Sequence, residues 1–173
     1  MITGDKMALR APEPCDVDMM FLLENDRSVW PHGRTRAPMS RQMLWEYVHN
    51  YDADILAAGQ ARMIIDIDGD AVGMVDLYDI DVLNRRAGVS IMIGKPYRNA
   101  GNGLAALKLL AEYAHKDLGL HQLWAVVSSD NAPSRALFAA AGYSVSGCLR
   151  SWVRVGEHYT DAYVHQLLLV EPR

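Results

Sequence analysis

The order of apolar and polar residues predicts two helices in the first third of the chain. Residues 17–23 are apolar, and Asp16 and Asp18 stand in the first turn, where acidic side chains favour a helix start. Ser40 is a suitable N-cap for a second helix, because its hydroxyl can accept from a free backbone N–H. The face of that helix expected to be buried carries Met43, Leu44, Tyr47, Val48 and Tyr51.

The rest of the chain predicts strands around two further helices. Short apolar or alternating segments typical of strands lie at residues 7–11, 62–67, 71–78, 88–93 and 123–127, and residues 151–170 are expected to form a hairpin that turns at Gly156-Glu157. One helix is expected to begin at Leu104 and end at Gly119, and a shorter one to begin at Pro133 and end at Gly142. We therefore predict a mixed α/β (α+β) sheet with flanking helices, in a single domain that spans residues 1–173.

Composition narrows the class of protein. Half of the 173 residues are apolar and 22% are charged, which is the balance of a globular domain and excludes wholesale disorder. The net charge of −4 disfavours nucleic acid as a partner. The longest apolar run, residues 136–141, is too short to span a membrane, so we expect a cytoplasmic protein without a membrane partner. Cys15 and Cys148 form no motif, and we expect both to be reduced.

The segment from Lys95 to Gly103 is too rich in glycine and proline for regular structure. Two glycines that open an apolar helix let backbone N–H groups point at an anion, aided by the positive end of the helix dipole. Phosphate is the usual ligand, and Arg98 stands at the start of the loop. We expect Gly101 and Gly103 to lie too close to a phosphate to tolerate a β-carbon. The alternative is a turn that needs two glycines for backbone reasons.

Two motifs give a resemblance to a known family. Residues 98–105, RNAGNGLA, resemble the R/Q-x-x-G-x-G/A loop of the GNAT acetyltransferase superfamily. Residues 131–138, NAPSRALF, followed by Gly142-Tyr143, resemble its second motif, and the spacing between the motifs also fits. Residues 73–77 and 84–87 are similar to the spermidine acetyltransferase and RimJ/RimL-type branches. The resemblance implies a central, mostly antiparallel sheet whose middle strands splay apart.

The resemblance also implies acetyl-CoA as a co-substrate and indicates its site. The pyrophosphate would lie on the loop formed by Arg98, Asn99, Ala100, Gly101, Asn102, Gly103 and Leu104. The pantetheine arm would run between strands 88–93 and 123–127, bonded by backbone groups of Ile91, Met92 and Ile93. Asn131, Ser134 and Phe138 would complete the cofactor site from the other side. An ordinary helix cap is the alternative role of Asn131.

The expected catalytic groups depart from the usual pattern of the family. Acetyl transfer to an amine requires that the amine lose a proton, that the carbonyl oxygen be stabilised, and that the thiolate leave. Many members of the family protonate the thiolate with a tyrosine where this chain has Phe138. Tyr143 or water substitutes, or no acid is used, which is tolerable because a thiol has a pKa of about 8.5. The alternative role of Tyr143 is packing in the core. Asp76 is the candidate carboxylate that attracts the cationic amine and removes its proton.

The substrate residues are expected on one strand and one loop. Asp76, Asp79 and Asp81 are taken to alternate along a strand and to share one face, which is either an amine-binding face or a solvated edge. Trp30, Arg34 and Arg36 lie in the loop before Ser40. Two arginines would repel a polycation, so we expect an amine with an anionic or neutral tail rather than spermidine.

We therefore predict an acetyl-CoA-dependent N-acetyltransferase that acts on a primary amine of a small molecule by direct attack in a ternary complex. The alternatives are a protein N-terminal acetyltransferase of RimJ/RimL type and a non-catalytic CoA-binding module. No metal is expected, because the six histidines show no ligand spacing. The last hairpin, with Trp152 and Tyr163, indicates a possible homodimer surface.

Overall fold

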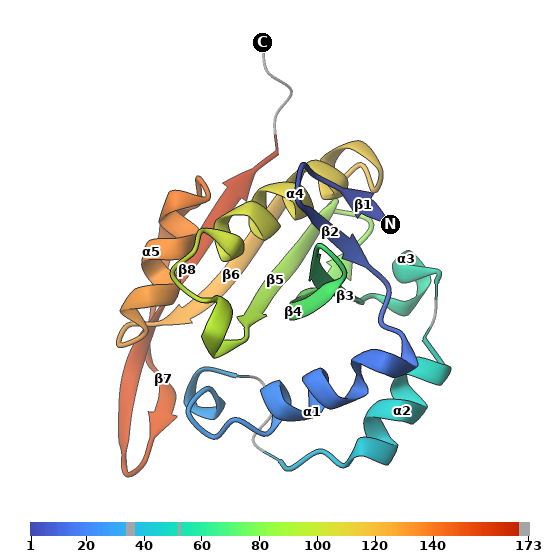
Figure 1. Cartoon of the computed structure of the whole chain (residues 1–173). Helices are drawn as coiled ribbons and strands as arrows, with labels where there is room; N and C mark the ends of the chain where they lie inside the picture. Colours follow the sequence, from blue (N-terminus) through green and yellow to red (C-terminus); the bar gives the residue numbers. More distant parts are fainter. Residues whose placement is uncertain (34–36, 52, 170–173) are drawn as a thin grey trace.

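The structure is a computed structural model, and it describes residues 1–33, 37–51 and 53–169 (Figure 1). Five α-helices, three short 3-10 helices and eight strands follow one another within that part of the chain. The helices are η1 (Pro14–Asp16), α1 (Val17–Glu24), η2 (Trp30–His32), α2 (Arg41–His49), α3 (Ile55–Ala58), η3 (Lys95–Tyr97), α4 (Asn102–Lys116) and α5 (Ala132–Ala140). The strands are β1 (Ile2–Thr3), β2 (Met7–Arg10), β3 (Ala61–Ile67), β4 (Asp70–Asp81), β5 (Arg86–Ile93), β6 (Gln122–Ser128), β7 (Ser144–Val155) and β8 (His158–Leu168).

All eight strands form one sheet in the order β1-β2-β3-β4-β5-β6-β8-β7. Every pair is antiparallel except β5 with β6, which is the single parallel pair. This pair holds only from Arg86 to Gly88 against Gln122 to Trp124, and beyond that point the two strands diverge without pairing to each other. The predicted mixed sheet with splayed middle strands is therefore confirmed.

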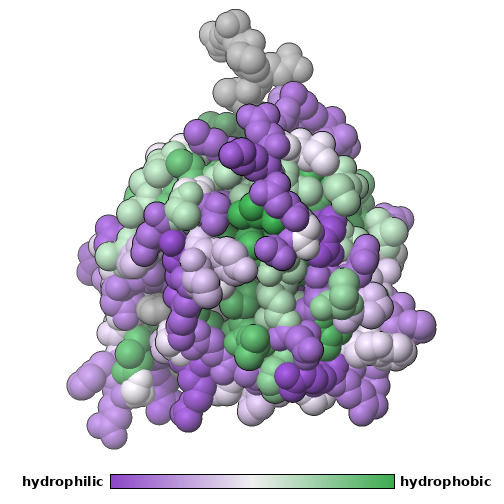
Figure 2. Space-filling view, viewed as in Figure 1, coloured by the Kyte–Doolittle hydropathy of each residue, from purple (hydrophilic) through white to green (hydrophobic). Residues whose placement is uncertain are grey.

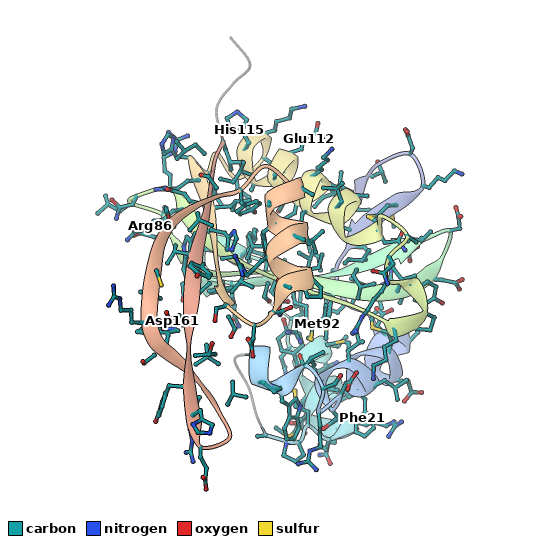
Figure 3. All side chains as sticks on the ribbon, turned by 90° about the vertical axis from the view of Figure 1, so that its left-hand side faces the viewer. Phe21, Arg86, Met92, Glu112, His115 and Asp161 are labelled. Carbon is teal, nitrogen blue, oxygen red and sulfur yellow. The ribbon has the colours of Figure 1, made fainter. Side chains whose placement is uncertain are left out.

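Helices cover both faces of the sheet, and Figure 3 shows the layers with α4 and α5 above it and α1 and α2 below it. On one face, α4 presents Ala106, Leu107, Leu110 and Ala114 to the main core. On the other face, α1 and α2 pack on Ile64 and Met74, with Met92 against the same cluster. The cavity described below lies where these two layers meet the splayed strands.

The sequence missed two short elements and misjudged some positions. Strand β1 and helix α3 are too short to give a periodic signal. Met43 is 55% exposed, although its spacing placed it on the buried face of α2. Ser40 does cap α2, since its hydroxyl accepts from the N–H of Met43 at 3.1 Å. Helix α5 begins one residue earlier than expected, so Pro133 is its second residue.

Strand β4 has a bulge that changes the expected alternation of its aspartates. The pairing with β5 shifts register between Tyr78 and Asp81, and Asp79 has a φ of +49°. Asp76 and Asp81 lie on the same side only because the bulge adds a residue between them. Asp79 lies three positions from Asp76 and stands in the bulge itself, so the expectation that alternation places all three aspartates on one face is wrong.

No helix in the described part of the chain is long and apolar enough to cross a membrane.

Candidate functional site

A cavity of about 1360 Å³ opens between the splayed strands, the loop before α4, and the α1–α2 layer. It is larger than the pockets of about 300–1,000 Å³ that hold most small ligands. In Figure 2, hydrophobic side chains gather in the middle of the face turned to the viewer, and hydrophilic ones surround them. The cavity has two ends, which differ in chemistry.

One end follows the edge of β5 that β6 leaves unpaired. Ile91, Met92 and Ile93 line it from β5, and Ala125 to Ser128 line it from β6. Backbone groups that face a neighbouring strand need hydrogen-bond partners, and here an extended molecule can supply them as an added strand would. The geometry therefore suits the expected pantetheine arm.

The loop between β5 and α4 is shaped by its own hydrogen bonds. Arg98 donates from Nε to the carbonyl oxygen of Ile93 at 2.8 Å, which fixes the start of the loop to the end of β5. Asn99 and Gly101 have φ of +60° and +82°, a conformation that asparagine and glycine tolerate best. Asn102 closes the loop with a bond from Nδ2 to the carbonyl oxygen of Tyr97 at 2.9 Å.

The first turn of α4 is open to an anion. Its N-cap is Gly101, which has no side chain to accept from the first backbone N–H groups. Gly101, Asn102, Gly103 and Leu104 all line the cavity, so these donors and the positive end of the helix dipole lie at the cavity wall. Ala100 is not among the lining residues. A pyrophosphate fits this place by charge and by donor geometry.

The two glycines of the loop are required for different reasons. A β-carbon at Gly101 would meet nothing within 4 Å, so glycine is favoured there by its left-handed backbone. A β-carbon at Gly103 would lie 3.1 Å from the side chain of Leu137, which packs from α5. The expectation that both glycines are explained by proximity to phosphate is therefore incomplete, because Gly103 also allows α4 to approach α5.

Helix α5 supplies the opposite wall. Asn131, Ser134 and Phe138, which were predicted to contact acetyl-CoA, line the cavity. The Oδ1 atom of Asn131 accepts from the N–H of Ser134 at 3.2 Å, so Asn131 is also the N-cap of α5. Phe138 is only 3% exposed and gives this wall an apolar surface beside the splayed strands.

The other end of the cavity contains an ion-pair network. Arg62 donates from Nε and Nη2 to the two carboxylate oxygens of Asp76 at 2.7 and 2.9 Å, and from Nη1 to Glu24 at 2.5 Å. Ser90 donates to Asp76 at 2.9 Å. These side chains come from β3, β4, α1 and β5, and all of them line the cavity. The network joins the α1–α2 layer to the sheet.

Burial and charge act in opposite directions on this network. Burial opposes the charge on Arg62, but the hydrogen bonds and charges of Asp76 and Glu24 outweigh it and raise the pKa of the guanidinium. Burial raises the pKa of the neighbouring Tyr47 to about 12, so that phenol is neutral at physiological pH. This end of the cavity therefore combines the ion pairs of Arg62 with the neutral aromatic side chain of Tyr47.

Comparison with known proteins decides the family. A family model described as an acetyltransferase (GNAT) domain matches residues 6–144. The chain belongs to the GNAT acetyltransferase family. The family match and the similarity to known N-acetyltransferases make this protein an acetyl-CoA-dependent N-acetyltransferase, as the two motifs predicted.

Three relatives of this GNAT enzyme illustrate the range of the family. A spermidine N(1)-acetyltransferase of Escherichia coli is 27% identical over 97% of this chain and 91% of its own length. A ribosomal N-acetyltransferase, named as putative, of Bacillus subtilis is 30% identical over 58% of this chain and 55% of its own. The crystal structure of spermidine N-acetyltransferase from Vibrio cholerae with CoA and spermine has a TM-score of 0.86 at 21% identity. It covers 96% of this chain and 97% of that one, and shows the fold.

The candidate proton donor Tyr143 does not reach the cavity. Its side chain is 5% exposed, lies edge-on to Phe138 at 5.0 Å between ring centroids, and is absent from the cavity wall. Burial raises the pKa of its hydroxyl above the usual value, which makes the group a poorer acid. This placement favours the alternative role, packing in the core, and the catalytic role stays a prediction that the kinetics below test.

Two single substitutions, Tyr143→Phe and Phe138→Tyr, test whether the GNAT enzyme uses a tyrosine as general acid. We expect Tyr143→Phe to change kcat by less than about threefold, because the hydroxyl does not line the cavity. Phe138→Tyr is expected to leave the rate unchanged or to raise it modestly. Steady-state kinetics of both variants provide the measurement. A loss of about a hundredfold in Tyr143→Phe, the size expected for a general acid, would contradict this assignment.

Sequence reasoning missed the residues that surround Asp76. Arg62 and Glu24 carry no motif, and only their burial as charged residues marks them. Trp30 lines the cavity as expected, and Asp79 lines both this cavity and a second one of about 580 Å³. Arg34 and Arg36 lie outside the described residues. Asp76 is in the expected place, but its oxygens already accept three hydrogen bonds.

In the described part of the chain, no group of three or more histidine, cysteine, aspartate or glutamate residues is placed to hold a metal ion.

Proposed function

We propose that this GNAT enzyme transfers the acetyl group of acetyl-CoA to a primary amine of a small, polyamine-like molecule by direct attack in a ternary complex. The observation that carries the proposal is the continuity of the cavity, which joins an anion-binding loop to an acidic end. At the acidic end, two carboxylates among the described lining residues, of Glu24 and Asp76, share the guanidinium of Arg62. Such an excess of negative charge attracts a cationic amine.

The residues divide the work of the reaction. The first backbone N–H groups of α4 and the guanidinium of Arg98 hold the phosphates, while the unpaired edge of β5 orients the thioester arm. When bound, acetyl-CoA supplies the activated acetyl group. The acidic end concentrates the amine beside the divergence of β5 and β6. Phe138 excludes water from the opposite wall but offers no proton, so the leaving thiolate departs without an acid from this residue.

The charge of the acceptor is where structure and sequence differ. Arg34 and Arg36 suggested an amine with an anionic or neutral tail, but neither lies within the described residues. Around Arg62, this end has the acidic side chains of Glu24 and Asp76 and the aromatic side chains of Trp30 and Tyr47. They support a cationic, polyamine-like acceptor, which is also the substrate named for the E. coli relative.

An assay of thiol release with a panel of acceptors tests the proposal. The panel holds diamines, spermidine, monoamines, amino acids, amino sugars and a peptide with a free N-terminus. We expect the highest kcat/KM for the diamines and spermidine, which are the polyamine-like members of the panel. Turnover with the peptide alone would instead support an N-terminal acetyltransferase. Tight binding of acetyl-CoA with no turnover on any acceptor would indicate a non-catalytic module.

Two expectations about the surroundings of the enzyme remain predictions. We propose that it works in the cytoplasm, where acetyl-CoA is available. We also propose that the β7–β8 hairpin contributes to a homodimer, because Trp152 and Tyr159 are 61% and 62% exposed there. Tyr163, expected on the same surface, is half-buried beneath the guanidinium of Arg135. Sedimentation of the purified protein would measure the oligomeric state.

A further inference from the structure

Glu24 is a charged side chain in an unfavourable place. It is the last residue of α1, where the negative end of the helix dipole repels a carboxylate. Its side chain is only 11% exposed, and Asp76 brings a second carboxylate onto the same guanidinium. The one guanidinium of Arg62 therefore faces two carboxylates, and the negative end of the α1 dipole lies beside them. Local charge remains negative at this point of the cavity.

The oxygens of the two acids are not equally occupied. Both oxygens of Asp76 accept from Arg62, and one of them also accepts from Ser90. Glu24 accepts from Arg62 through Oε1, and within the described residues no donor bonds its Oε2. A carboxylate can accept about four hydrogen bonds. By this count Asp76 can accept about one more hydrogen bond and Glu24 about three, so Glu24 is the acid of this network with the larger remaining capacity.

The walls beside Glu24 suit an alkylammonium chain. The indole N–H of Trp30 donates to the backbone carbonyl of Glu24 at 2.8 Å, which fixes the indole in the wall next to it. The ring of Tyr47 lies 5.8 Å from the guanidinium of Arg62. Aromatic faces attract cations and pack against methylene groups. A flexible chain that carries a positive charge would find both contacts here.

We propose that Glu24 binds an ammonium group of the acceptor that stays charged during the reaction, and so selects diamines over monoamines. The attacking amine must be neutral, and a carboxylate that holds an ammonium stabilises its charged form. A firmly bound ammonium is therefore a poor nucleophile, and Glu24 suits the second amine rather than the attacking one. This inference rests on the proposed function and names the residue that sets its substrate class.

Substitution of Glu24 by glutamine tests the proposal with a matched pair of acceptors. The probes are 1,8-diaminooctane and octylamine, which differ only in the second amine. Glutamine can still accept from Arg62, so the variant keeps the fold while it loses the charge. We expect Glu24→Gln to lower kcat/KM for the diamine about tenfold or more, mainly through KM, because hydrogen bonds to charged groups are strong. Octylamine should change less than threefold.

Two further variants act as controls. Glu46→Gln removes an exposed carboxylate of α2 whose one hydrogen-bond partner among the described residues is Gln42, and kcat/KM for both acceptors should be unchanged. Glu24→Asp keeps the charge and should retain part of the preference for the diamine. If Glu24→Gln lowers kcat/KM equally for both acceptors, or for neither, the proposal is overturned.

Binding separates this inference from the proposed function. Calorimetric titration of 1,8-diaminooctane into the complex with CoA needs no turnover. If the wild type binds the diamine and Glu24→Gln does not, the inference holds even when no acceptor is acetylated and the proposed function fails. If the wild type and Glu24→Gln bind the diamine equally, or neither binds it, the inference is wrong whatever the enzyme acetylates.

Discussion

Replacing Gly73 with alanine is expected to lower the free energy of unfolding by about 3 kcal/mol or more. A β-carbon at Gly73 would lie 2.3 Å from the carbonyl oxygen of Met92 and 3.1 Å from the Cα of Ile93. Both atoms belong to the backbone of β5, which is paired to β4 at this point, so no side-chain rotation relieves the contact. Denaturation followed by circular dichroism gives the stability.

The same substitution should weaken acetyl-CoA binding, because Met92 and Ile93 line the cavity where β5 diverges from β6. Gly147→Ala is the matched control, since a β-carbon there meets nothing within 4 Å in another strand of the same sheet. We expect that control to be as stable as the wild type or slightly more so. A Gly73→Ala protein with wild-type stability would show that β4 and β5 do not approach each other as described.

Replacing Arg62 with methionine is expected to cost about 3–5 kcal/mol, the range measured when one partner of a buried ion pair is removed. The side chains of Arg62, Glu24 and Asp76 are 18%, 11% and 18% exposed, so two acids would remain with little access to water. Methionine preserves most of the packing volume, and the loss therefore reports charge. Chemical denaturation at neutral pH is the measurement.

Arg41→Met provides the comparison on the same face of the sheet. Arg41 and Asp18 form an ion pair at 2.6 Å, but their side chains are 56% and 77% exposed. Exposed pairs contribute about 0–1 kcal/mol, so this variant should remain close to the wild type. Equal losses in the two arginine variants would mean that the network around Arg62 is no more than a surface ion pair.

Local signals in the sequence were sufficient to predict the structure of the loop and the two helices at the other cavity end, where acetyl-CoA is expected. The apolar run after Gly103 predicts α4, the glycines and Asn99 suit the positive φ values before it, and Asn131 caps α5 as its residue type suggests. Each of these features depends on residues within a few positions of one another. The two GNAT motifs lie in these segments. The sequence alone therefore indicated the family that the family model then matched.

Only the tertiary structure decided which residues meet at the acidic end of the cavity. Glu24, Arg62, Asp76 and Ser90 come from four elements, and their contact depends on how α1 packs over β3, β4 and β5. No periodicity relates positions so far apart in the chain. Tyr143 shows the converse, because a tyrosine beside a motif can face the core or the cavity, and packing against Phe138 placed it in the core. Residue type determined which chemistry was available, and long-range packing determined which side chains meet.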